Sequence, residues 1–151
     1  MHQQMVYDWY QLYHTGLYRF ALSILKDPVS AEDALQETFV RLLQQDRLPD
    51  AEKGQAWLYR VVRNICYDIL RKRKRETEES EISTAPMDSN WEFLDLITPL
   101  PKKEQEILAL RFIGGFTHKE IAHIMGITVH GAKKRYERAI QALRKEMEVS
   151  I

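Results

Sequence analysis

Four basic side chains fall within six residues near the end of the chain. Lys133, Lys134, Arg135 and Arg138 lie in the stretch FTHKEIAHIMGITVHGAKKRYERA, residues 116–139. Its apolar residues are spaced as in two short amphipathic helices joined by a tight turn. Cationic side chains grouped on one helix can donate to phosphate oxygens and to guanine acceptors in a DNA groove. The alternative is an ordinary solvated helix surface.

Three kinds of residue mark the ends of the helices expected here. A proline suited to a first turn and capping threonines mark their starts, and glycines mark their ends. In chain order they are Pro101, the Gly114-Gly115 pair, the capping box of Thr117 with Glu120, the break at Gly126 and the cap at Thr128. They predict a helix up to the glycine pair, a short helix through about Met125 and a last helix after Thr128.

The last helix separates an apolar stripe from a basic face. The stripe is Ala132, Tyr136, Ala139, Ile140 and Leu143, and His130, Lys133, Lys134, Glu137 and Arg138 are chiefly outward, with Arg135 near the boundary. A short helix, a glycine-containing turn and a basic second helix form the helix-turn-helix whose last helix enters the major groove of DNA. We therefore expect DNA contacts from Thr128, His130, Lys133, Lys134, Arg135 and Arg138.

A second cationic helix is expected earlier, in AWLYRVVRNICYDILRKRKR, residues 56–75. Its core stripe is Leu58, Val61, Val62, Ile65 and Ile69, which makes Cys66 a small buried or half-buried neighbour. Off that stripe stand Tyr59, Arg60, Arg63, Asn64, Tyr67 and Arg71. Aromatic rings interleaved with guanidinium groups can stack unpaired bases and hold phosphates. A simple solvated face is again the alternative.

Two further helices are expected before this one. The first has an apolar stripe of Val6, Tyr10, Tyr13, Leu17, Phe20 and Ile24, and the second opens at SAED, where Ser30 can cap. The second buries Ala31, Leu35, Thr38, Phe39 and Leu42. Its opposite face carries Asp33, Gln36, Glu37 and Val40, spaced i, i+3, i+4 and i+7. That face is either a docking surface or an ordinary solvated one.

A catalytic or metal site is not expected. HKEIAH resembles a zinc-protease helix, but His118 and His123 are five residues apart, about 140° around a helix, and cannot chelate one ion from one face. The sequence has no cysteine partner, paired-carboxylate site or phosphate-binding glycine loop. We expect neither cofactor nor metal.

Charge divides the chain of 151 residues into three parts. Residues 1–75 hold 12 basic and 9 acidic residues, residues 76–97 hold none and 7, and residues 98–151 hold 10 and 6, for net charges of +3, −7 and +4. The segment ETEESEISTAPMDSN, residues 76–90, has the composition of a flexible linker. We therefore expect an all-α protein with a domain at 1–75, a linker at 76–97 and a domain at 98–151, although a long loop inside one domain is the alternative.

Composition also bears on location. There is one cysteine and no apolar run of about 18 residues, and MHQQMVYDWY lacks the features of a signal peptide. A cytoplasmic protein without direct membrane insertion is expected.

Three ordered motifs resemble those of bacterial sigma factors. DPVSAEDALQETFVRLL resembles the helix that binds core polymerase, and AWLYRVVRNICYDILRKRKR resembles the promoter-melting and −10-recognition helix. LPKKEQEILALRFIGGFTHKEIAHIMGITVHGAKKRYERAIQALR is similar to the C-terminal helix-turn-helix. Their order, the missing middle domain and the length fit the extracytoplasmic-function (ECF) group, and the resemblance covers nearly the whole chain except the linker.

The resemblance implies that the protein carries no chemistry of its own. It would hold RNA polymerase core, through the beta and beta-prime subunits, on promoter DNA. Asp33, Gln36, Glu37 and Val40 become the candidate polymerase face. The loop from Asp46 to Gln55 and the next helix would hold the non-template strand of the −10 element, and the last helix would read the −35 element. An anti-sigma factor that clamps both domains is common in the group, although no motif for one stands in this sequence.

One departure concerns the start of the last helix. Family members often show a Gly-Thr-Val-Lys-Ser-Arg-like run there, whereas this chain has HGAKKR, and Gly131 supplies no side chain for a base contact. The promoter sequence of other family members therefore does not transfer to this chain.

Two other classes of protein compete with this interpretation. A repressor or activator that binds DNA without polymerase would share the helix-turn-helix. A helical enzyme with an accessory DNA domain is the second class, but this sequence offers no site residues for it.

Overall fold

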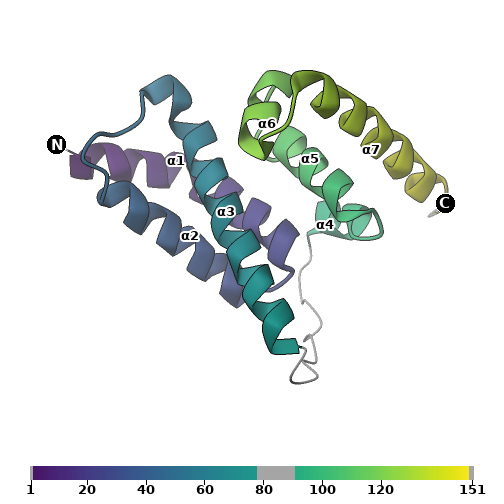
Figure 1. The fold of residues 1–151 in the computed structure, drawn as a ribbon, viewed down its shortest axis with the longest axis horizontal. Coiled ribbons are helices and arrows are strands. Elements are labelled where there is room, and N and C mark those ends of the chain that lie inside the picture. The colour runs from purple at the N-terminus through teal and green to yellow at the C-terminus, as the bar shows by residue number, and fades with distance from the viewer. Residues whose placement is uncertain (1, 78–90, 150–151) are drawn as a thin grey trace. The chain divides into compact units, whose positions relative to one another are not determined.

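All regular structure in residues 2–77 and 91–149, the ranges that the computed structural model describes, is helical, as the sequence predicts (Figure 1). The chain divides into two compact units, with helices α1 to α3 in the first and α4 to α7 in the second. The expected linker falls largely on residues 78–90, which lie outside the described residues. Of the other residues of the expected linker, 76–77 belong to the end of helix α3 and 92–97 form helix α4. No described helix combines the length and apolarity needed to cross a bilayer.

The first unit is a bundle of three helices that pack pairwise: α1 (His2–Leu25), α2 (Pro28–Leu43) and α3 (Ala51–Thr77). Each contributes large side chains to one apolar core, and burying each of these is worth roughly 1.5–3 kcal/mol. The largest core residues that are essentially inaccessible to solvent are Leu17, Phe20, Leu35, Leu42, Leu58 and Tyr59.

Asp27, and not Ser30, caps α2. The Asp27 carboxylate accepts hydrogen bonds from the backbone N–H groups of Val29 and Ser30, and Pro28 occupies the first turn. Proline lacks an N–H and has a helical φ, so it suits that position. The prediction that Ser30 caps the helix was therefore wrong: Ser30 lies inside the first turn and donates its hydroxyl to Asp27.

Helix α3 begins at Ala51, several residues before the start expected from its apolar stripe. Residues 51–55, predicted as loop, form its first turns. Gly54 is buried there against the indole ring of Trp9 in α1, and a Cβ at this position would lie 2.6 Å from the nearest ring carbon. The close approach of α1 explains a glycine inside a helix, where it is otherwise unfavourable.

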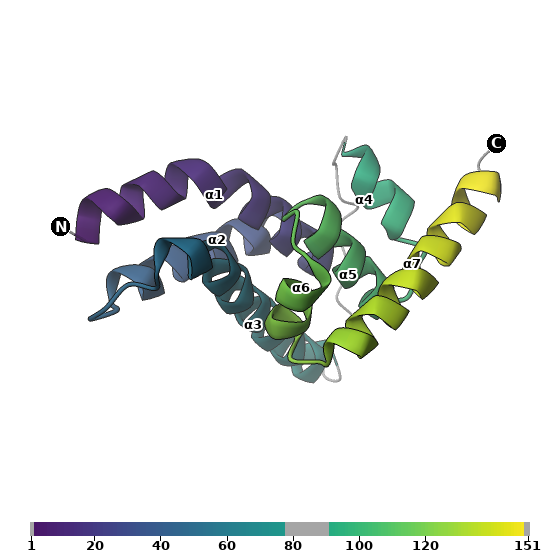
Figure 2. The same ribbon diagram turned by 90° about the horizontal axis from the view of Figure 1, so that it is seen from above.

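The second unit contains α4 (Glu92–Ile97), α5 (Lys102–Phe112), α6 (His118–Met125) and α7 (Val129–Val149). Helices α4, α5 and α6 all pack on α7, and Figure 2 shows α5 and α6 beside it. Its core includes Leu94, Ile97, Ile107, Leu108, Leu110, Phe116 and Ile121. The Gln105 side chain fixes the α4–α5 connection by donating to the carbonyl oxygens of Thr98 and Leu100, at 3.2 and 2.6 Å.

Candidate nucleic-acid and protein interfaces

Helices α6 and α7 form the predicted helix-turn-helix. The capping box is present: the Glu120 N–H donates to Thr117 Oγ1 at 3.2 Å, and the Thr117 N–H donates to Glu120 Oε1 at 2.9 Å. Gly126 ends α6 in the left-handed conformation, with φ of 70°. The Gly131 N–H donates to Thr128 Oγ1 at 3.0 Å. The stops and caps predicted from the sequence around this turn are therefore confirmed.

The two faces of α7 also agree with the sequence pattern. Ala132 and Ala139 are buried, and Tyr136, Ile140 and Leu143 are half-buried. The ring of Tyr136 packs edge-on against His118 of α6, with centroids 5.1 Å apart, which fixes α7 against the preceding helix. On the other side, the exposed residues are Thr128, His130, Lys133, Lys134, Glu137 and Arg138, with Arg135 half-buried. The unit therefore presents a cationic helix face to solvent.

Helix α3 carries a second cationic surface. Arg63, Asn64, Tyr67 and Arg71 line a surface cavity of about 460 Å³ together with Asp68. The Arg63 guanidinium lies over the Tyr67 ring, 4.8 Å from its centroid, and Arg71 forms an ion pair with Asp68. Four of the six residues predicted on this helix are therefore brought together. We call Arg63, Asn64, Tyr67, Asp68 and Arg71 the α3 cluster; Arg60 is exposed on the same helix, outside the cavity lining.

Tyr59 does not belong to this outer face, and its assignment as a DNA contact was wrong. Its exposed fraction is 1%, and its ring lies 5.2 Å from that of Phe20. It shares a helix face with Val62 and Cys66, at i+3 and i+7, which are also buried. Burial raises the pKa of the Tyr59 hydroxyl, as does Tyr13 to a smaller extent.

Tyr59 was wrongly assigned because the buried face of α3 is wider than its apolar stripe indicates. Both α1 and α2 pack against α3, so the covered surface is wider than a single stripe. As a consequence Tyr59 and Cys66 are fully buried, whereas Val61 and Ile69, predicted in the core, are only half-buried.

Helix α2 has the two faces that the sequence predicts. Ala31, Leu35, Thr38, Phe39 and Leu42 are buried, and the opposite side exposes Asp33, Gln36, Glu37 and Val40. Only one of these four is held by an ion pair with its own helix: Arg41 Nε lies 3.2 Å from Glu37 Oε1. Val40 is 44% exposed, so an apolar side chain sits among the polar ones. We call these four residues the α2 face.

Within the described ranges, no group of three His, Cys, Asp or Glu side chains is placed to hold a metal ion. What sequence reasoning missed is the contribution of Asp68 to the α3 cluster and the role of Asp27 and Arg73, which contact each other at the α1–α2 turn. The Asp-Pro pair was a usable signal, because an N-cap followed by proline is a common helix start.

Comparison with known families accounts for both units. Residues 9–76 match sigma-70 region 2, and residues 91–143 match sigma-70 region 4. The chain is similar to the ECF RNA polymerase sigma factor SigM of Bacillus subtilis, with 35% identity over 89% of this chain and 90% of that protein. It is also similar to EcfG of Rhodopseudomonas palustris, with 32% identity over 82% of this chain and 75% of that protein.

Among solved structures, the fold resembles the sigma factor RpoE crystallised with the anti-sigma factor NepR from Bartonella quintana. The TM-score is 0.78 at 27% identity, covering 94% of this chain and 96% of that one. The two matched regions occur in the order that the motifs predict. The chain therefore belongs to the sigma-70 family, in its ECF group, and is a non-enzymatic transcription initiation factor that directs RNA polymerase to promoters.

Proposed function

We propose that the two units divide promoter recognition: the first binds core polymerase and captures one strand of the −10 element, and the second reads the −35 element in duplex DNA. The observation that carries this proposal is the pair of separate cationic helix surfaces, the α3 cluster and the outer face of α7. They differ in chemistry. The α3 cluster combines an aromatic ring with guanidinium groups, whereas the α7 face is basic and polar and belongs to a helix-turn-helix.

The α3 cluster suits an unpaired strand. Tyr67 is half-buried and partly covered by Arg63, so a base has a platform of ring and guanidinium on which to stack. Base–aromatic stacking contributes about 1–3 kcal/mol per base and does not need a paired partner. Arg60 and Arg71 are exposed nearby on the same helix and supply positive charge for phosphates. The −10 strand is the part of a promoter that becomes single-stranded, so it fits this surface.

The α2 face suits a protein partner. It is exposed, two of its four residues are carboxylates, and Val40 adds an apolar contact within a polar rim. Protein interfaces combine apolar anchors with polar surroundings in this way. We assign the face to RNA polymerase core, in line with the resemblance to the polymerase-binding helix of the family. The beta and beta-prime subunits are the proposed partners.

The outer face of α7 suits a major groove. Lys133 and Lys134 are exposed in the early part of the helix, which a helix-turn-helix directs toward base edges. Arg138 is exposed one turn later, where phosphate is the nearer partner. Gly131 has no side chain, and its N–H donates to Thr128. Base recognition at the helix start therefore depends on Thr128, His130, Lys133 and Lys134.

The test compares single alanine variants of α7 in reconstituted holoenzyme at several salt concentrations. Lys133→Ala or Lys134→Ala should cost about 1–3 kcal/mol on the selected −35 element and much less on unrelated DNA. Arg138→Ala should weaken all duplexes about equally and reduce the salt slope by roughly one unit. Lys145→Ala, exposed near the end of α7, is the matched control and should change neither quantity. Equal losses on every DNA for both lysines would mean that α7 holds the backbone without reading sequence.

An anti-sigma factor is a candidate partner, because the similar RpoE structure was obtained in complex with one, NepR. A cytoplasmic location is proposed because RNA polymerase and promoter DNA are there. Pull-down with the tagged full chain from the cytoplasmic fraction of the source bacterium tests these partners. Polymerase subunits should be recovered, and their absence would contradict the assignment of the α2 face; recovery of no second protein beside them would contradict the anti-sigma proposal.

A further inference from the structure

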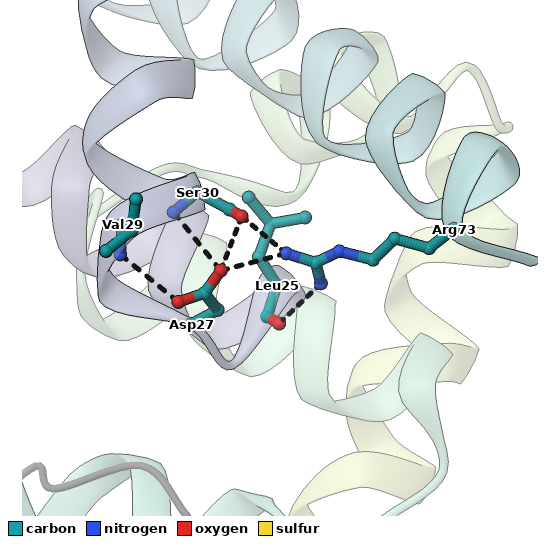
Figure 3. Close-up of polar contacts among 5 residues, drawn as sticks. All are labelled: Leu25, Asp27, Val29, Ser30 and Arg73. Atoms are coloured by element: carbon teal, nitrogen blue, oxygen red, sulfur yellow. Dashed lines mark hydrogen bonds and ion pairs between the residues drawn. The ribbon is translucent and has the colours of Figure 1, made fainter. Parts of the chain in front are cut away.

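Arg73 differs from the other cations at the end of α3. It lies in the run RKRKR, residues 71–75, whose other members are all exposed. The Arg73 side chain is only 32% exposed and reaches toward the turn between α1 and α2 (Figure 3). There Nη1 donates to the Leu25 carbonyl at 3.2 Å, and Nη2 donates to Asp27 Oδ2 at 3.1 Å and to Ser30 Oγ at 2.5 Å. One guanidinium thus contacts an acceptor in α1, an acceptor in α2 and an acceptor at the junction between them.

The three acceptors lie where α1 ends and α2 begins. Leu25 is the last residue of α1, where carbonyl oxygens lack a helical partner. Lys26 then turns the chain with φ of 59°, and Asp27 caps α2. Ser30 accepts from Arg73 and donates to Asp27, so the hydroxyl completes a closed set of hydrogen bonds (Figure 3). The guanidinium therefore joins α3 to the point where the chain passes from α1 to α2.

Apolar packing holds this end of α3 only weakly. Cys66 is fully buried, but from Tyr67 to Glu76, all within the described part of the helix, every residue is half-buried or exposed. The Arg73 contacts therefore form a polar anchor on a stretch with few buried neighbours. A planar guanidinium can donate in two directions at once, whereas a lysine amine cannot reproduce this fork.

We propose that Arg73 is a positioning residue and not a phosphate contact: by joining α3 to the α1–α2 turn, it holds the DNA-facing α3 cluster in a fixed direction relative to the α2 face. The inference rests on the proposed function for its consequence in strand capture. It predicts that loss of Arg73 loosens the end of α3 in the free protein and weakens −10 capture in the holoenzyme, while polymerase binding is kept.

The first measurement is amide hydrogen exchange of the free, full-length chain. Arg73→Ala should speed exchange across residues 70–76, and Arg73→Lys should do the same to a smaller extent. Lys72→Ala is the matched control, since Lys72 is the exposed neighbour with the same charge, and it should leave exchange unchanged. Equal exchange in the wild type and Arg73→Ala would overturn the proposal, whatever the outcome with DNA.

The second measurement uses holoenzyme and a fluorescent fork DNA with an unpaired −10 strand, taken from the sequences that wild-type holoenzyme selects. At a temperature where all variants are folded, Arg73→Ala should weaken binding about five- to tenfold, which corresponds to about 1–1.4 kcal/mol, the net contribution of one ordinary hydrogen bond. Core affinity and the salt slope should not change. Asp27→Asn combined with Arg73→Ala should be no weaker than Arg73→Ala alone, because the two act through one contact.

A phosphate contact gives a different pattern. In that case Arg73→Ala would lower the salt slope by roughly 0.7 units, the value for one phosphate of a single strand, Arg73→Lys would restore it, and Asp27→Asn would have no effect. That pattern would overturn the proposal. If the wild-type holoenzyme selected no DNA, the proposed function would fail, and the exchange comparison would still decide whether Arg73 anchors α3.

Discussion

Two tyrosines eight residues apart on α3 should respond to substitution in opposite ways. Tyr59 is fully buried against Phe20, whereas Tyr67 is half-buried beside Arg63 at the surface cavity. Replacing a buried aromatic residue with alanine costs about 3–5 kcal/mol, a large share of the roughly 5–15 kcal/mol by which a small domain is stable. Tyr59→Ala should therefore destabilise or unfold the first unit. Tyr67→Ala removes a partly exposed ring and should change stability by about 1 kcal/mol or less.

In a DNA-binding assay, the larger loss should come from substitution of Tyr67 and not of Tyr59. We expect Tyr67→Ala holoenzyme to bind single-stranded −10 DNA about 1–3 kcal/mol more weakly, the usual contribution of one stacked base. Tyr59→Phe keeps the buried ring and should capture the strand as the wild type does. Urea denaturation of the full chain and fluorescence anisotropy with fork DNA give the two quantities. Wild-type strand capture by Tyr67→Ala, or a specific loss in a folded Tyr59→Phe, would refute the division of α3 into a buried face and a DNA face.

Three other perturbations test separate parts of the first unit. Asp33→Arg with Glu37→Arg should leave stability within about 0.5 kcal/mol, because both residues are exposed, yet weaken core binding; co-elution equal to the wild type would exclude this face. Gly54→Ala should lower the free energy of unfolding by about 1–3 kcal/mol, since the new Cβ would overlap Trp9, and unchanged urea unfolding would contradict that packing. The hydrogen bond from Ser30 lowers the pKa of Asp27 below its ordinary 3.8, so the stability it provides is complete above that pH and is lost as pH falls through the folded-state pKa. Asp27→Asn should flatten the loss of stability below about pH 4, and identical acid unfolding curves would show that the carboxylate does not contribute.

The sequence predicted the helix-turn-helix almost completely because its signals are local. Thr117, Glu120, Gly126 and Thr128 act within one or two turns of their own position, and each has the predicted cap or stop. The faces of α2 and α7 were also predictable, since each helix buries one side against its neighbours and the 3.6-residue period identifies that side.

Features that depend on contacts between helices were not predictable in this way. Tyr59 is buried because α3 is covered by two helices, and no pattern within α3 gives that width. A glycine stands at position 54 inside α3 because Trp9, far away in the sequence, packs against it. Arg73 belongs to a basic run in the sequence, and its partial burial and its contacts with Leu25, Asp27 and Ser30 distinguish it from its exposed neighbours.

We propose that this chain gives core RNA polymerase a promoter specificity through two separate DNA surfaces. The most direct measurement is selection from a random duplex library by the full-length chain together with core polymerase from its source bacterium, with core alone and chain alone as controls. We expect that only the complete holoenzyme enriches DNA with two conserved elements at a fixed spacing. Lys134→Ala should relax selection of the upstream element, and Tyr67→Ala should weaken selection of the downstream one. Enrichment of a single palindromic element by the chain without polymerase, or no enrichment beyond core alone, would contradict the proposal.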